Sequence, residues 1–525
     1  MLAVLLLIGV FSLLYFLVTK PFKYWDHKNV PTGKIWPLIK ENILVMFGKT
    51  SIVELIKKIY NNVEGVRYIG IYQLNTPILV LKSPEIIKQI CVKDFDHFLD
   101  HGVMFAGDSS NLFSRNLLVL KGQHWKNMRA TLSPSFTSSK MKSMFVLICN
   151  IAEIYAQHYV NKKDKIIEID FKDILARYTN DVIANTAFGI QVDSLTDREN
   201  EFYVMGRDST NFSKPWRKFT IFIFQAFPSI AKLLGLKILP DKVNDFFLNL
   251  VQDTIRMREE QNIKRPDMLG LLMEARKGQG KEFQTEKIEE ASFAAVKEHL
   301  EENYTKLDLT DFDIASQVFV FFFAGFETVS TAMCFMAHEL AINADVQRRL
   351  IEEIDENKPA SGAPSYEIIA NMEYLDMVVS ETLRKWPINI ATDRVVTKPY
   401  TIDPELPSEQ PLHLEPNQNV MIPIFAIRWD PQNYENPEKF DPERFSSENR
   451  KNIDPYIYIP FGVGPRNCIG SRFALLEMKA VFFYLLSYFE IVPVEKTNVP
   501  IKISKSNITL TSENGFPLGL KRRNQ

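Results

Sequence analysis

The spacing of apolar and polar positions predicts long helices separated by a few short strands. Residues 311–342 contain no proline and are apolar nearly all round in the middle, which predicts one long buried helix. Further helical patterns cover 374–385 and 471–489. Two apolar runs within 65–82 are separated by Asn75-Thr76-Pro77, a turn signal, so this segment is predicted to form a hairpin.

Cap and turn residues predict shorter elements. Ser83-Pro84-Glu85 marks a helix over 84–92, because serine caps the end, proline suits the first turn and an acid favours the N-terminus. Residues 419–424 and 507–520 resemble strands, and the second contains the turn signal Asn514-Gly515.

Two segments are rich in aromatic residues. Residues 97–118 mix glycines with phenylalanines and predict an irregular apolar loop, a kind of segment that is more often functional than filler. Residues 202–239 read as helices interrupted by prolines, and their aromatic side chains form either ordinary core or a hydrophobic lid with a membrane-facing surface. The aromatic residues of this second segment include Phe212, Trp216, Phe219, Phe222, Phe224 and Phe227.

The N-terminus carries a strongly apolar run over residues 2–18, long enough at about 1.5 Å per residue to cross most of a bilayer. A cleaved signal peptide would need a basic start and small residues at its end, whereas bulky Tyr15, Phe16 and Leu17 stand there. An uncleaved transmembrane signal anchor over 1–20 is therefore favoured. The lysines that follow keep the body of the protein in the cytosol.

Composition favours one large domain behind this anchor. The 525 residues include 46% hydrophobic residues, and neither a linker nor a repeat divides them. Prolines within 21–40 predict a stiff hinge, and 41–525 then forms the main folded domain. A net charge of −2 argues against nucleic acid as a partner. The four cysteines are scattered, which suits a reducing compartment.

Cys468 lies in a setting that favours a thiolate. It follows a Gly-x-Gly-Pro turn and precedes the predicted helix 471–489, whose dipole favours the charged sulfur. Arg466 adds positive charge two residues away. A thiolate is a soft ligand for iron. The plainer alternative is that this cysteine is a small buried apolar side chain.

The whole stretch Phe461–Gly470 resembles the haem-binding loop of the cytochrome P-450 superfamily, Phe-x-x-Gly-x-Arg-x-Cys-x-Gly, with every fixed position filled. The resemblance implies a mainly α fold with small β-sheets, haem b (iron protoporphyrin IX) as cofactor and Cys468 as axial ligand of the haem iron. The loop residues that it places at the cofactor are Phe461, Gly462, Arg466 and Gly470.

Trp125 and Arg129 stand i,i+4 on one helix face, where an indole N–H and a guanidinium could clamp a carboxylate. Alone, the pair would more often be a packed tryptophan beside a surface charge. It resembles the family's Trp-x-x-x-Arg signature, which places both residues on a haem propionate. The wider resemblance implies that Arg394 and Arg466 also bind the propionates.

Inside the long helix, Ala324-Gly325-Phe326-Glu327-Thr328 resembles the family's oxygen-binding motif. The resemblance implies that Ala324 lies beside the haem, that Thr328 donates or organises a proton and that Glu327 feeds it. A satisfied core threonine is the plainer alternative. Val329 stands where many relatives carry a second hydroxyl, which argues against a relay of two adjacent hydroxyls.

Glu381 and Arg384 are an i,i+3 pair of a kind that is usually worth little on a surface. Together with Arg444 in Pro442-Glu443-Arg444-Phe445 they resemble the family's E-x-x-R and P-E-R-F signatures. The resemblance implies a structural ion network that holds the cysteine loop. The resemblance and the aromatic segments also suggest a substrate pocket formed by Phe105, Phe113, Phe323, Ile390 and Phe516.

The amino-acid sequence around these motifs resembles that of the insect branch that includes family nine. This branch is related to vertebrate drug-metabolising family three. This implies a monooxygenase in the endoplasmic reticulum membrane that uses dioxygen and oxidises lipophilic xenobiotics such as insecticides or plant toxins. Electrons would come from NADPH through NADPH–cytochrome P-450 reductase, with cytochrome b5 as a second candidate partner. Lys126, Arg472 and Lys479 are candidate docking contacts.

Two other functions are compatible with the cysteine loop. One is a haem-thiolate isomerase or dehydratase that rearranges peroxides, against which Glu327 and Thr328 argue. The other is a membrane-tethered protein that binds haem or a lipophile without turnover.

Overall fold

The computed structural model describes residues 20–73, 76–102, 111–277, 292–296, 307–360, 362–507 and 509–523. These residues are mainly helical, with short strands gathered in small sheets. The α-helices are α2 (Tyr24–His27), α3 (Ile35–Met46), α4 (Ile52–Tyr60), α5 (Pro84–Lys88), α6 (Gly122–Leu132), α7 (Ser138–Val160), α8 (Phe171–Ile183), α9 (Glu201–Thr210), α10 (Pro215–Ala226), α11 (Pro228–Leu233), α12 (Asp241–Glu260), α13 (Met268–Arg276), α14 (Asp311–Ile342), α15 (Ala344–Asn357), α16 (Tyr366–Asn371), α17 (Glu373–Lys385), α18 (Ile424–Arg428) and α19 (Ser471–Tyr488).

Three small sheets accompany the helices. A four-stranded sheet has the order β1-β2-β7-β4, a three-stranded sheet the order β3-β9-β8, and β5 pairs with β6. All neighbours are antiparallel except β2 and β7, which run parallel. The strands are β1 (Tyr68–Gln73), β2 (Thr76–Leu81), β3 (Ile166–Asp170), β4 (Thr392–Val395), β5 (Tyr400–Ile402), β6 (Leu412–Leu414), β7 (Asn419–Ile422), β8 (Phe489–Pro493) and β9 (Pro517–Arg522).

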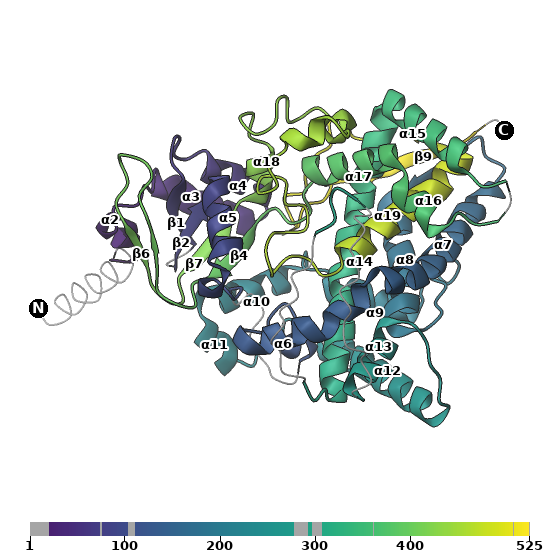
Figure 1. Cartoon of the computed structure of the whole chain (residues 1–525), viewed down its shortest axis with the longest axis horizontal. Coiled ribbons are helices and arrows are strands. Elements are labelled where there is room, and N and C mark those ends of the chain that lie inside the picture. Colours follow the sequence, from purple (N-terminus) through teal and green to yellow (C-terminus); the bar gives the residue numbers. More distant parts are fainter. Residues whose placement is uncertain are drawn as a thin grey trace, which may run out of the picture.

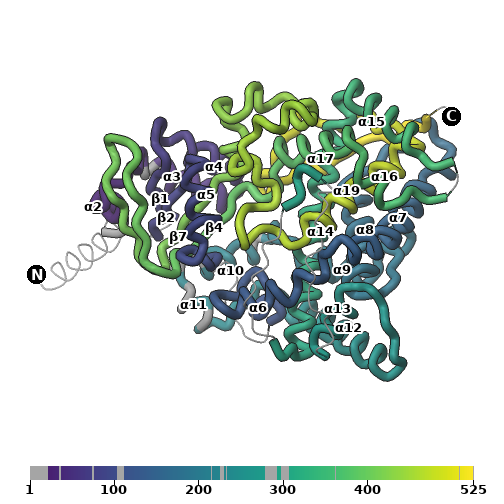
Figure 2. Tube along the Cα trace, in the orientation of Figure 1, coloured from purple at the N-terminus to yellow at the C-terminus, as the bar shows by residue number. Residues whose placement is uncertain are grey.

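Helix α14 runs through the middle of the molecule, as predicted from its apolar pattern. Thr310 caps its start, accepting a hydrogen bond from the Asp313 N–H, while the Asp313 carboxylate accepts one from the Thr310 N–H. Figure 1 shows the four-stranded sheet with α2 to α5 at one end of the molecule and most other helices at the opposite end. In Figure 2 the chain that leads into α19 crosses the centre near α14, against which α19 packs.

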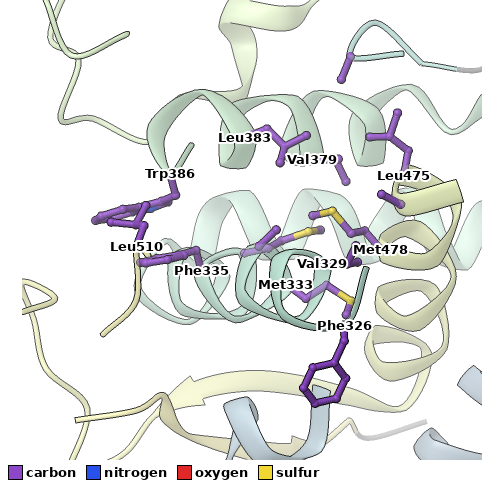
Figure 3. Close-up of a cluster of buried hydrophobic side chains, with 14 of the residues drawn as sticks. Phe326, Val329, Met333, Phe335, Val379, Leu383, Trp386, Leu475, Met478 and Leu510 are labelled. Carbon is purple, nitrogen blue, oxygen red and sulfur yellow. The ribbon is translucent and has the colours of Figure 1, made fainter. Parts of the chain in front are cut away.

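The core is densest where α14 meets α17 and α19. Figure 3 shows apolar side chains of the three helices pointing toward one another, with Met333 of α14 between them. Phe335 stacks on the indole of Trp386, with ring centroids 4.5 Å apart. Because α17 carries Glu381 and Arg384 and α19 directly follows the cysteine loop, this packing fixes the relative positions of the predicted motifs.

The predicted elements are confirmed with small shifts. The long helix has the predicted bounds, and the hairpin over 65–82 is β1 paired with β2. Thr76 and Pro77, which were predicted to lie in the turn, belong to β2. The helix predicted over 84–92 is α5, capped by Ser83, followed by a π-helical turn over Gln89–Lys93.

The segment predicted as a hinge over 21–40 packs against β1 at Trp25. Trp25 is fully buried and its Nε1–H donates to the Ile71 carbonyl at 3.0 Å. The indole lies directly over Gly70, where an added Cβ would come within 2.4 Å of the ring. Prolines break the helical continuity here, but burial of Trp25 on β1 builds this segment into the domain.

The predicted anchor over 1–20 lies almost entirely outside the described residues. Among those residues, α14 alone is long and apolar enough to cross a membrane. Most of its apolar stretch is buried inside the protein, in keeping with its position in the core.

Candidate active site

The loop before α19 is held in a tight curl that brings Cys468 back toward Phe461. The Cys468 N–H donates to the Phe461 carbonyl at 2.8 Å, and the Asn467 N–H donates to the Gly464 carbonyl at 3.0 Å. Gly462 and Gly464 both have positive φ, at 76° and 74°, a conformation that L side chains rarely adopt. Helix α19 begins three residues after the sulfur.

Gly464 has a second reason to be glycine. A Cβ at this position would lie 1.9 Å from the backbone oxygen of Cys91, in the π-helical turn after α5. At Gly462 the nearest atom to an added Cβ is the Asn467 Cα, at an ordinary 3.7 Å. The loop is therefore pressed against the Cys91 backbone at Gly464, whereas Gly462 serves the turn itself.

Cys468 is exposed, although Arg466 and Asn467 just before it are buried. Ala324 is likewise exposed in the middle of α14, a helix whose other residues are mostly buried. The exposed thiol thus lies on the loop before α19, and the exposed small residue lies on α14. Helix α14 packs against α19.

Arg466 stands at the centre of a cationic cluster beside the cysteine. Its guanidinium lies over the Trp125 ring, 3.9 Å from the centroid, and donates to the Leu99 and Leu120 carbonyls at 2.8 and 2.9 Å. Burial, and then the nearby positive charge of Arg394, lower the pKa of Arg466 to about 9.

Arg129 and Arg394 join this cluster through the cysteine loop. Arg129 donates to the backbone oxygen and the side-chain oxygen of Asn467, at 2.8 and 2.6 Å. Arg394 donates to the Val463 carbonyl at 3.2 Å. Both arginines therefore hold the loop as well as bring charge to it, a role that the sequence motifs do not reveal.

One donor of the cluster is unpaired within the described part of the chain. The buried Nε–H of Arg394 has no hydrogen-bond partner there. Buried donors normally find partners. Three neighbouring guanidinium groups, one with a spare donor, match a ligand that carries more than one carboxylate, and haem carries two propionates. The donor set and the exposed thiol therefore fit haem.

On α14, Thr328 and Glu327 bond other partners rather than each other. The Thr328 hydroxyl donates to the Ala324 carbonyl one turn earlier, at 2.5 Å. Glu327 does not bond Thr328; its carboxylate accepts from the Lys172 ammonium on α8 at 2.8 Å. Lys172 also donates to the hydroxyls of Ser330 and Thr331, at 3.1 and 2.7 Å.

Lys172 was missed from the sequence. It lies 155 residues before Glu327, at the start of a helix whose pattern indicates only an amphipathic surface. Contact between α8 and α14 brings the two together. An unpaired acid in the middle of an apolar helix is the one signal that could have prompted a search for a basic partner.

The predicted ion network forms around Glu381. Arg384 donates to both carboxylate oxygens at 2.8 Å, and both residues are fully buried. The Asp441 N–H donates to the same carboxylate at 2.8 Å, and the Arg444 Nε lies 3.7 Å away. Glu381 thereby ties α17 to the Pro442–Phe445 turn, some 20 residues before the cysteine loop.

Some of the predicted pocket residues come together on α14. Phe113 meets the rings of Phe319 and Phe323 edge-on, with centroids 5.3 and 4.8 Å apart. Phe212 meets Phe323 in the same way at 6.0 Å. Phe323 directly precedes the exposed Ala324, and these rings therefore border the motif.

The remaining pocket predictions fare differently. Ile390 is partly buried just before β4, and its carbonyl accepts from the Phe425 N–H at 2.9 Å. Phe516 is 1% exposed and packs edge-on against Phe335, eleven residues along α14 from Ala324. Its N–H donates to Asp170 at 3.1 Å, which holds it in the core. Phe105 lies outside the described residues.

One predicted docking contact is wrong. Lys479 is 1% exposed, because its ammonium pairs with Asp376 at 2.8 Å between α19 and α17. Lys126 is near the surface but pairs with Asp96 at 2.9 Å. Arg472 is partly exposed at the start of α19.

Comparison with known proteins gives this arrangement its family. The cytochrome P450 family model matches residues 31–518. The chain belongs to the cytochrome P450 family. It is therefore a haem enzyme of the monooxygenase class that uses dioxygen, and the fit of the cysteine loop to haem has the expected chemistry.

Named cytochromes P450 of insects are similar along almost the whole chain. Cytochrome P450 9e2 of Blattella germanica is 44% identical over 525 residues, which cover 97% of this chain and 96% of that protein. Probable cytochrome P450 9f2 of Drosophila melanogaster is 40% identical, with 98% and 99% covered. Cytochrome P450 6k1 of Blattella germanica is 35% identical, with 98% and 96% covered. The predicted resemblance to insect family nine is thus confirmed.

Proposed function

We propose that this cytochrome P450 inserts one atom of dioxygen into lipophilic xenobiotics, such as insecticides or plant toxins, with electrons from NADPH delivered by a separate reductase. The observation that carries the proposal is the exposed Cys468 thiol between the cationic cluster and the start of α19. The names of the insect relatives support the same class of enzyme.

In this proposal Cys468 is the axial ligand of the haem iron. The dipole of α19 and the positive charge of Arg466 favour its thiolate. Arg129, Arg394, Arg466 and Trp125 hold the propionates, while Phe461, Gly462, Gly470 and Ala324 border the ring. Haem, when bound, supplies the iron at which dioxygen is activated.

Thr328 and Glu327 serve proton delivery. The Thr328 hydroxyl can exchange its bond to the Ala324 carbonyl for one to a water molecule, and so present a proton on that face of α14. Glu327 is partly exposed, pairs with Lys172 and accepts a hydrogen bond from the Thr331 hydroxyl. A proton that arrives through Lys172 and Thr331 reaches Glu327 before Thr328.

The aromatic rings near Ala324 favour bulky apolar or aromatic substrates. Phe113 and Phe323 pack edge to face next to Ala324. Ile390 lies just before β4 and is partly buried. Such surfaces bind lipophilic molecules chiefly by excluding water, so they select for size and shape more than for a single polar group.

Membrane association is supported by α10 and α11. Phe219 and Leu233 are 61% and 85% exposed, and Trp216, Ile230 and Leu234 add further exposed apolar area. Exposed apolar patches of this kind mark interaction surfaces. We propose that they rest on the endoplasmic reticulum membrane, with the anchor over 1–20 crossing it and the domain on the cytosolic side.

Arg472 and Lys126 remain candidate contacts for NADPH–cytochrome P-450 reductase, and cytochrome b5 is a second candidate partner. Arg472 lies in the first turn of α19, the helix that follows the cysteine loop. It is therefore close to the thiolate ligand along the chain. A positive surface there would steer an acidic redox partner toward the haem.

The proposal is tested by reconstitution with reductase in lipid vesicles. The reduced carbon-monoxide spectrum reports the thiolate ligand, and substrate-dependent NADPH consumption with an oxygenated product reports turnover. A normal thiolate band without NADPH consumption would favour a peroxide isomerase or a binding protein.

Replacing Thr328 by alanine tests the proton role separately. We expect Thr328→Ala to retain haem and the thiolate band but to release more hydrogen peroxide for each NADPH consumed. Thr254→Ala is the matched control, because the Thr254 hydroxyl on α12 is buried and likewise donates to a carbonyl one turn earlier, that of Leu250. Equal coupling in the two variants would refute the role of Thr328.

A further inference from the structure

Arg428, at the end of α18, is a buried cation that the haem chemistry does not use. It is 0% exposed, and its Nη1 donates to the Leu383 carbonyl at 2.5 Å. Its Nε and Nη2 have no hydrogen-bond partner within the described part of the chain. Two buried guanidinium donors are therefore aimed at a region where the protein supplies no acceptor.

Among the described residues, the charged or ionisable neighbours that act on Arg428 are Tyr458, Tyr434 and Arg384, and none of them is a carboxylate. The buried carboxylate of the network, Glu381, is already bonded through both oxygens to Arg384. Burial lowers the pKa of Arg428 to about 10, which still leaves the guanidinium protonated at neutral pH.

Two buried hydroxyl groups on neighbouring segments also lack partners in the part of the chain that the structure describes. The Tyr434 hydroxyl and the Ser380 hydroxyl are both buried and unpaired within the described residues. The Arg384 guanidinium lies over the Tyr434 ring at 5.3 Å, and the Arg428 guanidinium lies over the Tyr458 ring at 5.4 Å. The Tyr458 hydroxyl donates to the Ser380 carbonyl at 3.0 Å, which links Ser380 to the same group.

We propose that a small monovalent anion of the halide class binds among Arg428, Tyr434 and Ser380. A buried charge without a partner is strongly unfavourable, and an anion both neutralises Arg428 and accepts from the four spare donors. Water could accept the same hydrogen bonds but would leave the charge unbalanced. The site lies at the junction of α17 and α18, so the anion stabilises the Glu381 network without touching substrate.

Crystallography of the holoenzyme gives the direct test. Protein expressed, purified and crystallised with bromide in place of chloride should show an anomalous peak within hydrogen-bond distance of the Arg428 Nε or Nη2. Bromide is introduced throughout, because exchange into a buried site is slow. Density that fits only water, or a peak elsewhere alone, would overturn the proposal.

Thermal inactivation supplies a second readout. At constant ionic strength, loss of the thiolate band should occur at a higher temperature in chloride than in gluconate, a much larger organic anion. Arg428→Met should abolish this difference, whereas Arg450→Met, which removes an exposed arginine, should keep it. Equal temperatures in the two salts for the native protein would overturn the proposal, and so would a chloride effect that persists in Arg428→Met. If Arg428→Met fails to fold, the native comparison and the bromide map still decide.

Discussion

Alanine at Gly464 tests whether the cysteine loop is pressed against the backbone of Cys91. The added Cβ would lie 1.9 Å from the Cys91 carbonyl oxygen, whereas real Cβ atoms stay beyond 3.0 Å. The atom it meets is backbone, which cannot rotate away as a side chain could. The loop that carries Cys468 must therefore move as a whole.

The expected cost has two parts. Positive φ costs a residue with a Cβ about 1–2 kcal/mol, and overpacking adds about 1–3 kcal/mol. Gly464→Ala should therefore cost about 2–5 kcal/mol. Gly462→Ala is the matched control, since its φ is 76° against 74° for Gly464 but its Cβ would meet nothing closer than 3.7 Å. It should cost only about 1–2 kcal/mol.

The assay follows the thiolate band of the carbon-monoxide complex as urea is added, because a large haem protein does not unfold in one reversible step. We expect Gly464→Ala to lose the band at clearly lower urea than Gly462→Ala, and to contain less haem after purification. Equal midpoints for the two variants would refute the close contact with Cys91.

Two further substitutions test the ion pairs. Glu381→Gln leaves the fully buried Arg384 without its charge partner, so it should cost about 3–5 kcal/mol and yield protein largely devoid of haem; full haem content by absorbance would contradict the network. Lys172→Met removes the 2.8 Å partner of Glu327, a partly exposed pair, so it should change stability by at most about 1 kcal/mol while raising the peroxide released per NADPH; unchanged coupling would exclude Lys172 from proton delivery.

The sequence was sufficient where function is encoded in short stretches. The curl around Cys468, the buried pair of Glu381 and Arg384, and the bounds of α14 each depend on residues near one another in the chain. Glycine spacing and an unbroken apolar run are local signals. The i,i+3 pair is also local, but its role in a structural network was predicted only from the family resemblance.

Other features depend on packing between distant segments and could not be read. The partner of Glu327 is Lys172, and only the contact between α8 and α14 brings them together. Lys479 looked like a surface charge because the sequence does not show that Asp376 faces it inside the protein. Phe516 follows a correctly predicted turn, but the bond from its N–H to Asp170 sends its ring toward Phe335 rather than Ala324.

The central claim is that Cys468 is the thiolate ligand of a catalytic haem. Cys468→Ser tests it most directly, with haem content and the reduced carbon-monoxide spectrum measured beside Cys149→Ser, which alters a buried cysteine of α7. We predict that Cys468→Ser loses the thiolate band and all NADPH-dependent turnover, while Cys149→Ser keeps both. A thiolate band that persists in Cys468→Ser would contradict the account.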